Sequence, residues 1–97
     1  MANLERESKA NAWLTEKVRS KWGDPRVRVM RIRWATGGPA GGVIEVELQR
    51  DLADTSFEKI KDVRVQTAGA PWRERKSCLD PDVLRAIADA LPDTLPP

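Results

Sequence analysis

The sequence predicts a single α+β domain: an N-terminal helix, an antiparallel sheet of three to four strands, and a C-terminal helix packed on the same sheet face. Three observations predict this fold. The length of 97 residues suits one domain with one core. Apolar residues alternate with polar ones between 26 and 49. Apolar residues near both ends of the chain recur at helical spacing.

The first helix is expected over residues 4–22. Its apolar positions return to one side every three or four residues, and they are Leu4, Trp13, Leu14, Val18 and Trp22. Gly23 is a helix stop, and Asp24-Pro25 then breaks the helix because proline biases the preceding residue toward extended backbone. The spacing indicates that both tryptophans belong to the core.

A β-hairpin is expected over residues 26–49, with the glycine-rich stretch 37–42 as its connection. This stretch is not a phosphate loop, because an alternating strand follows it instead of Lys-Ser/Thr or a helix. Alternation places Met30, Ile32 and Trp34 on one apolar face.

We expect Ile32 to lie opposite Ile44, and Met30 opposite Val46. The same register sets Arg31 opposite Glu45, Arg33 opposite Val43 and Val29 opposite Glu47. Arg28 and Arg33 then lack an obvious acidic partner.

The segment 50–61 is ambiguous, because Phe57 and Ile60 are spaced as in a helical turn while Phe57 also belongs to an alternating run. We expect a loop with one turn of helix there. A strand follows over 62–67, with Val63 and Val65 inward. Residues 72–79 form either a fourth strand or an irregular edge.

The last helix is expected over 81–91, followed by a mobile tail over 92–97. Asp80 suits the N-cap position, Pro81 the first helical position, and Asp82 the positive end of the helix dipole. The apolar stripe of this helix consists of Val83, Leu84, Ile87, Ala88 and Leu91.

The composition excludes most catalytic machinery. The chain has no histidine and one cysteine, Cys78, which removes histidine-based triads, zinc sites and internal disulfides together. Cys78 precedes a helix but is expected to be a small packed residue. We therefore predict neither an enzyme nor a cofactor. Because no apolar run approaches a membrane span and no secretory signal is apparent, we expect a cytoplasmic protein.

Charge is unevenly distributed, although the net charge is only +2. Residues 26–76 carry eleven basic and seven acidic groups, whereas residues 77–97 carry one basic and four acidic groups. The candidate basic face consists of Arg28, Arg31, Arg33, Arg64, Arg73 and Arg75. Trp34 and Trp72 are the candidates for base stacking beside it. The alternative for this face is a solvated surface whose arginines pair with neighbouring carboxylates.

The order of helix, strands and helix resembles double-stranded-RNA-binding domains, and a basic sheet followed by one helix resembles the single-strand-binding transcriptional coactivators. The first family would carry a lysine-rich start to its last helix, where this chain has Asp80-Pro81-Asp82. The second would have no long N-terminal helix. We assign the chain to neither family.

The sequence thus predicts a small accessory or regulatory protein that acts by protein–protein contact, as an inhibitor, adaptor or assembly component. A homodimer is one form such contact could take. The alternative is a nucleic-acid-binding protein that uses the arginine-rich sheet face with its flanking tryptophans.

Overall fold

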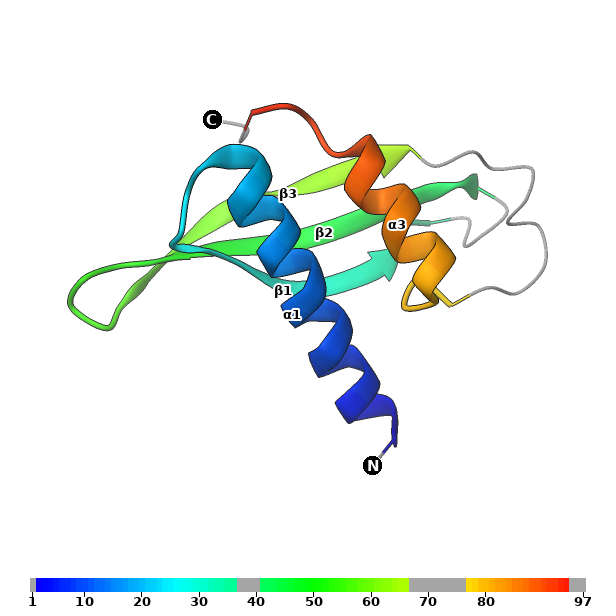
Figure 1. Ribbon diagram of the computed structural model, residues 1–97, viewed down its shortest axis with the longest axis horizontal. Coiled ribbons are helices and arrows are strands. Elements are labelled where there is room, and N and C mark those ends of the chain that lie inside the picture. The colour runs from blue at the N-terminus through cyan, green and yellow to red at the C-terminus, as the bar shows by residue number, and fades with distance from the viewer. Residues whose placement is uncertain (1, 37–40, 67–76, 95–97) are drawn as a thin grey trace.

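The computed structural model describes residues 2–36, 41–66 and 77–94, with the side chains described from residue 4 onward. Helix α1 (Ala2–Trp22) comes first, strands β1 (Val27–Trp34), β2 (Val43–Asp51) and β3 (Phe57–Gln66) follow, and helix α3 (Pro81–Ala90) comes last. Figure 1 shows this order along the chain. The α+β class is confirmed.

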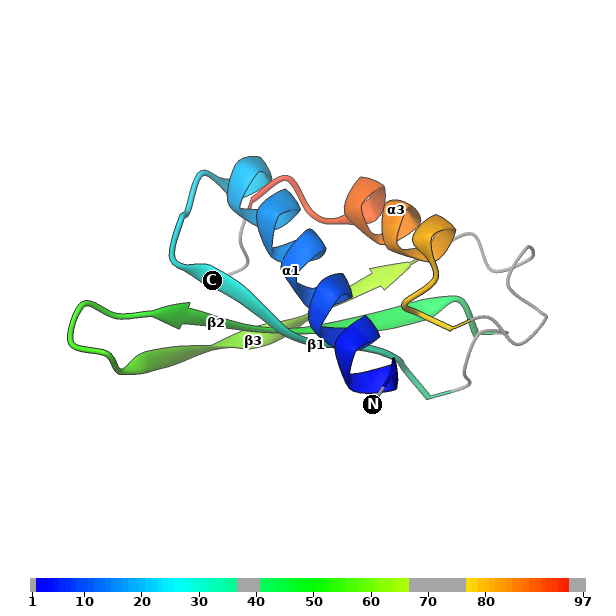
Figure 2. The same ribbon diagram turned by 60° about the horizontal axis from the view of Figure 1, so that its bottom comes forward.

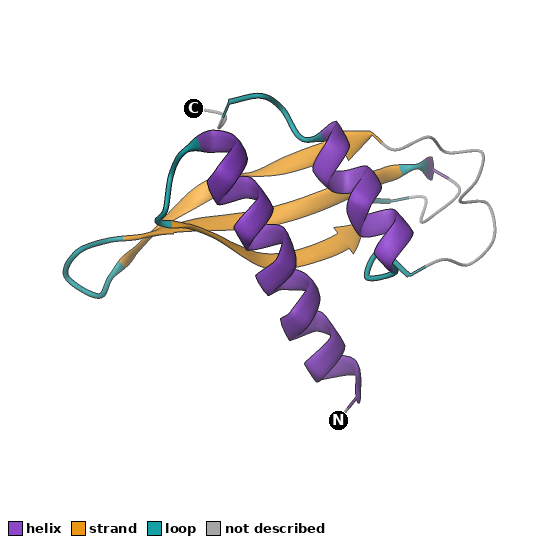
Figure 3. Ribbon diagram, viewed as in Figure 1, coloured by secondary structure: helices purple, strands orange, loops and turns teal. Residues whose placement is uncertain are grey.

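The three strands form one antiparallel sheet in the order β1-β2-β3, and both helices lie on the same side of it (Figure 2). We call the helix-covered side the inner face and the opposite side the outer face. Figure 3 shows the two layers by secondary structure. The predicted strand over 72–79 falls largely outside the described residues, and 77–79 form a turn.

The core lies between the inner face and the helices. From α1 it takes Ala10, Leu14 and Val18, which are spaced four residues apart. Trp13 and Trp22 pack beside them while partly buried, but Leu4 is 65% exposed and does not join the predicted stripe. The predicted stripe of α3 is confirmed: Val83, Leu84, Ile87 and Leu91 are buried, and Ala88 is partly buried.

The register of the hairpin differs from the predicted one. Ile32 lies opposite Val46, and Trp34 lies opposite Ile44. The difference is two residues throughout 31–34, on the turn side of the strand. A separate irregularity lies at Met30, which has no partner between Val29 and Arg31, as in a β-bulge. Met30 is therefore 43% exposed, and its expected place on the inner face is wrong.

Strand β3 begins at Phe57, where a loop with a helical turn was expected. This strand contains a second irregularity. Leu48 pairs with Ile60 and Val46 with Val63, so β3 has one extra residue opposite Glu47. The bulge in β1 lies opposite the same part of β2. Both edge strands are therefore distorted beside the same residue of the central strand.

Side chains of α1 cover the free edge of β1. The Thr15 hydroxyl accepts a hydrogen bond from the Val29 backbone N–H at 3.0 Å. Asn11 Nδ2 donates to the Met30 carbonyl at 3.2 Å, and Arg19 Nε donates to the Val27 carbonyl at 2.9 Å. These contacts satisfy edge groups that would otherwise be open to pairing with another strand.

The conformation of Gly23 and the hydrogen bonds of Asp24 fix the turn between α1 and the sheet. Gly23 has a φ of 64°, the left-handed conformation in which glycine commonly ends a helix. Asp24 accepts hydrogen bonds from the Arg26 backbone N–H at 3.0 Å and from Arg50 Nε at 2.9 Å. The Arg26 bond, together with the bond and charge of Arg50, holds the pKa of the Asp24 carboxyl below its ordinary value.

Helix α3 begins at Pro81, as predicted, but the Asp80 side chain does not cap it. That carboxylate instead pairs with Arg6 of α1 and accepts the Ser77 backbone N–H at 3.3 Å. At the other end, Lys21 Nζ donates to the Leu91 carbonyl at 2.8 Å, and Trp22 Nε1 donates to the Pro92 carbonyl at 2.7 Å. The start of the predicted mobile tail is therefore bonded to α1.

We predict that Thr15→Val destabilises the fold by about 1 to 3 kcal/mol, because it leaves the buried Val29 N–H without an acceptor while preserving side-chain shape. Thr15 is only 7% exposed, so water cannot easily take its place. Urea unfolding measures the change, with Thr15→Ser as the control that keeps the hydroxyl. A Val variant as stable as the wild type would show that this bond is dispensable.

Candidate functional site

The predicted basic face is partly assembled on the outer face of the sheet. Arg28, Arg31 and Arg33 come from β1, and Arg64 comes from β3 across the sheet. Arg73, Arg75 and Trp72 lie outside the described residues. The structure therefore brings four of the six predicted arginines to one face.

Carboxylates from β2 and β3 lie among these arginines and pair with them. Arg33 Nη2 lies 3.0 Å from Glu45 and 3.4 Å from Asp62, and Nη1 lies 4.0 Å from Glu47. The hydrogen bond and charge of Glu45, with the charges of Asp62 and Glu47, raise the pKa of the Arg33 guanidinium. Arg33, predicted to lack a partner, is the most heavily paired arginine on this face.

The neighbouring arginines are paired in the same way. Arg28 Nη2 lies 2.5 Å from Asp51, and Arg64 Nη2 lies 3.3 Å from Glu45. Hydrogen bonds from Gln49 and Arg28 lower the pKa of the Asp51 carboxyl. Three of the four described arginines are thus paired, Arg33 and Arg64 through their shared Glu45 and Arg28 separately with Asp51. Each has to leave a carboxylate before it can bind a phosphate.

Three cations of the outer face have no carboxylate partner among the described residues: Arg31, Lys59 and Lys61. Both lysines belong to edge strand β3, where charged residues discourage pairing with another strand. Sequence reasoning gave Arg31 a partner, Glu45, but the observed register places Arg31 opposite Glu47 and gives Glu45 to Arg33 and Arg64.

Trp34 does not join the arginines. It lies opposite the buried Ile44 and packs partly buried against the core, which places it on the inner face. The structure therefore places Trp34 on the inner face and the arginines on the outer face, although Arg31, Arg33 and Trp34 line one hollow at the edge of β1.

A groove that the sequence did not indicate lies between α1 and α3. Its volume is about 500 Å³, within the range of about 300 to 1,000 Å³ that binding clefts span. Its floor is apolar and consists of Ala10, Trp13, Leu79, Pro81 and Leu84. The charged residues that line it are Arg6, Lys9 and Arg85, all of them cations. We call the five apolar residues the floor of the groove and the three cations its rim.

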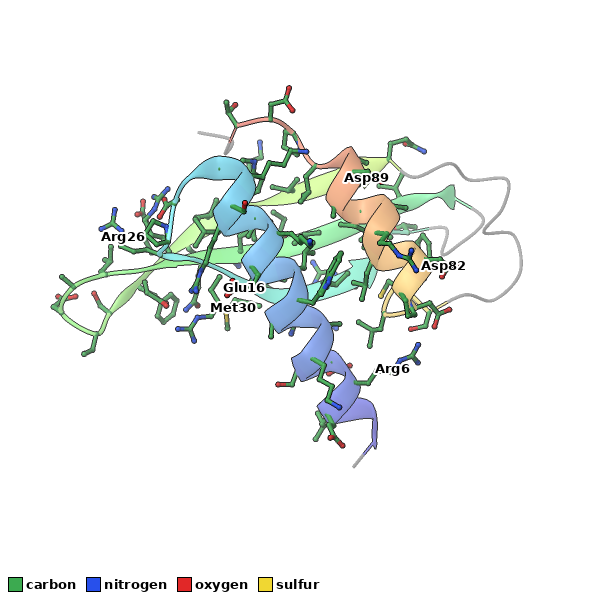
Figure 4. The ribbon with its side chains drawn as sticks, in the orientation of Figure 1. Arg6, Glu16, Arg26, Met30, Asp82 and Asp89 are labelled. Carbon is green, nitrogen blue, oxygen red and sulfur yellow. The ribbon has the colours of Figure 1, made fainter. Side chains whose placement is uncertain are left out.

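The row of α1 residues that faces α3 explains the groove. Residues 9, 13, 17 and 21 are spaced four apart, so they lie along one side of the helix. Arg6 and Lys21 reach the two ends of α3 and hold the helices together there. Figure 4 shows Arg6 between the N-terminal half of α1 and the start of α3. Trp13 lines the groove between these two ties, and the Lys17 ammonium lies 5.3 Å from the centroid of its ring.

Cys78 has a structural role. Its thiol donates to the Ile32 carbonyl at 3.3 Å and packs against the core. Burial raises the pKa of the Cys78 thiol, so little reactive thiolate forms near neutral pH. Within the described residues, no three acidic, cysteine or histidine side chains gather where they could hold a metal ion.

Comparison with known proteins places the chain in no family: no family model matches it, and neither a curated protein nor a solved structure is significantly similar. None of the described helices is both long and apolar enough to cross a membrane.

We expect Arg33→Met to lower the free energy of unfolding several times more than Arg31→Met does. The first change leaves Glu47 and Asp62 without a cation and Glu45 with only the exposed Arg64, whereas the second removes a cation that no described carboxylate binds. Urea unfolding at low salt measures both. The difference should shrink at about 1 M salt, where the screening length falls to about 3 Å. Equal losses at low salt would contradict the assignment of Arg33 as the hub of this network.

We also expect Cys78 in the folded protein to react with a disulfide reagent at least about tenfold more slowly than in urea, because its thiol is partly buried and its pKa is raised. The reaction is followed by absorbance at several pH values, with a short cysteine peptide as the reference. A folded protein that reacts as fast as the peptide would mark Cys78 as an accessible, activated thiol.

Proposed function

We propose that this chain is a non-enzymatic accessory or regulatory domain that acts by protein–protein contact, and that the groove between α1 and α3 is its contact site. The observation that carries the proposal is the groove itself: an apolar floor lies between two helices, where Trp13, Leu79 and Pro81 reach the surface above the buried Ala10 and Leu84. An exposed apolar patch bordered by charged residues is typical of an interaction site. Tryptophan and arginine are also the residue types that most often dominate binding energy at interfaces.

Binding by an exposed strand receives less support. The free edge of β1 is covered by side chains of α1. The other edge strand, β3, carries Lys59 and Lys61 and an irregularity beside them, which are features that oppose strand addition. The helix side of the molecule is therefore the better candidate for contact. The single cysteine supports a cytoplasmic location, and a second copy of the chain is one candidate partner.

Nucleic-acid binding is the second candidate function. Arg31, Lys59 and Lys61 favour it, because a phosphate could reach them without displacing a described carboxylate. The carboxylates around Arg33 oppose it, and so does the position of Trp34 on the inner face.

The protein-contact proposal is tested by selecting peptides from a displayed random library on the immobilised full chain. We expect the enriched peptides to lose at least about tenfold in affinity for Trp13→Ala and for Pro81→Glu, because the first empties the floor and the second places a larger side chain in it. Pro81 is exposed at the first turn of α3, where glutamate is compatible with a helix, so this variant should fold. Lys61→Ser on the outer face is the control. Enriched peptides that bind all variants equally, or no enrichment, would overturn the proposal.

The nucleic-acid alternative is tested by fluorescence anisotropy of labelled single-stranded and double-stranded oligonucleotides at low and near-physiological salt. Phosphate binding predicts an affinity that falls steeply with salt. It also predicts a large loss for the double variant Arg31→Glu with Lys61→Glu, which leaves the Arg33 network in place. Tight, salt-sensitive binding that this variant abolishes would establish nucleic-acid binding; no binding at low salt would remove this candidate.

A further inference from the structure

We propose that the partner of the groove is an acidic amphipathic helix, whose apolar side fills the floor while its aspartate and glutamate residues meet the rim. This inference rests on the proposed function and specifies the chemistry of the partner.

The charged residues that line the groove are all cations, although two of them pair with carboxylates outside it. Its rim consists of Arg6, Lys9 and Arg85, and Lys17 lies next to them over the Trp13 ring. Asp80 neutralises Arg6, and that pair is already used to join the two helices. Lys9 has only the exposed partner Glu5 at 3.6 Å, with side chains 79% and 71% exposed, so their pairing is weak.

Lys17 and Arg85 have no ion pair within the described part of the chain. Lys17 on α1 and Arg85 on α3 therefore place positive charge without a described carboxylate partner on both sides of the apolar floor. A partner with apolar residues flanked by carboxylates matches this pattern, and complementary charges of this kind chiefly raise the association rate and the specificity.

The helices that form the groove favour a helical partner over an extended one. Backbone hydrogen bonds are satisfied within α1 and α3, and Pro81 has no N–H to offer. An extended peptide would find no backbone partners there and would leave its own polar groups unpaired when buried. A helix satisfies its backbone internally and needs only side-chain contacts, with apolar anchors three and four residues apart.

The floor also argues for a protein partner. Leu79, Pro81 and Leu84 offer apolar surface, with no hydrogen-bonding group for a sugar or phosphate. Trp13 offers one ring, and the Lys17 ammonium already lies over it. Nucleic acid that used the rim charges would leave this apolar surface uncovered.

The test uses two synthetic peptides of about four helical turns, each with the same leucine stripe at positions i, i+3, i+4 and i+7. One peptide carries glutamate at the flanking positions, and the other carries lysine there. Fluorescence anisotropy with the full chain at low salt should show at least about tenfold tighter binding of the glutamate peptide. Circular dichroism of both peptides checks that their helix content is the same.

Charge reversal supplies the sharper comparison. Lys9→Glu with Arg85→Glu should reverse the preference in favour of the lysine peptide, because it reverses the two rim charges that Asp80 does not neutralise and leaves the floor intact. Lys59→Glu with Lys61→Glu makes the same change of net charge on the outer face and should leave the preference unchanged. All four residues are exposed, so both double variants should fold, which urea unfolding confirms.

The outcomes separate this inference from the proposed function. Equal binding of the two peptides, tighter binding of the lysine peptide, or no binding of either overturns the acidic-helix partner. Library-selected peptides that still depend on Trp13 and Pro81 would then leave the protein-contact function standing. An oligonucleotide that displaces the glutamate peptide from the wild type, and fails to bind the Lys9→Glu with Arg85→Glu variant, would also overturn the inference and assign the rim to phosphate.

Discussion

Three polar side chains of α1, spaced four residues apart, hold that helix against the free edge of β1. Asn11, Thr15 and Arg19 reach successive backbone groups of the strand, so they fix both the position of the helix and its rotation about its axis. Once this row faces β1, the neighbouring row of α1 must face the sheet. That row consists of the core residues Ala10, Leu14 and Val18. The row that contains Trp13 then faces α3. The groove between the helices therefore follows from how α1 is attached to the sheet edge.

The fold class was predictable because it depends on patterns within short stretches of sequence, whereas the register was not. Val29 and Ile32 are both buried although they are three residues apart, and so are Ile60 and Val63. Strict alternation cannot bury both members of such a pair, so each strand needs an extra residue between them. Another pair three apart, Phe57 and Ile60, made the start of β3 resemble a helical turn, yet the strand is regular between them and Phe57 is exposed. A spacing of three therefore signals a bulge only where both residues are buried.

The candidate sites were less predictable, because they depend on contacts between distant residues. Local alternation correctly placed Arg31 and Arg33 on one face, but it puts Arg28 on the face of Met30, and only the bulge brings Arg28 to the outer face. The two-residue difference in register then decided which arginine meets a carboxylate. The groove depends on Arg6 and Asp80, which are 74 residues apart. Helical periodicity assigned Trp13 to the core, and it does pack there. Periodicity cannot show that the same ring also lines an open groove, because this depends on how closely the second helix approaches.

The two charged surfaces differ in what a ligand must displace. On the outer face, a phosphate approaching Arg33 competes with three carboxylates that lie 3.0 to 4.0 Å from its guanidinium. Binding there costs an existing ion pair for each new contact, and the gain is correspondingly small. Beside the groove, Lys17 and Arg85 have no described carboxylate to lose, and the adjoining floor adds the burial of apolar surface. A ligand that combines negative charge with apolar side chains would gain from both terms at the groove, whereas on the sheet Arg31, Lys59 and Lys61 offer it charge without the apolar floor. For this reason we propose the groove as the binding surface.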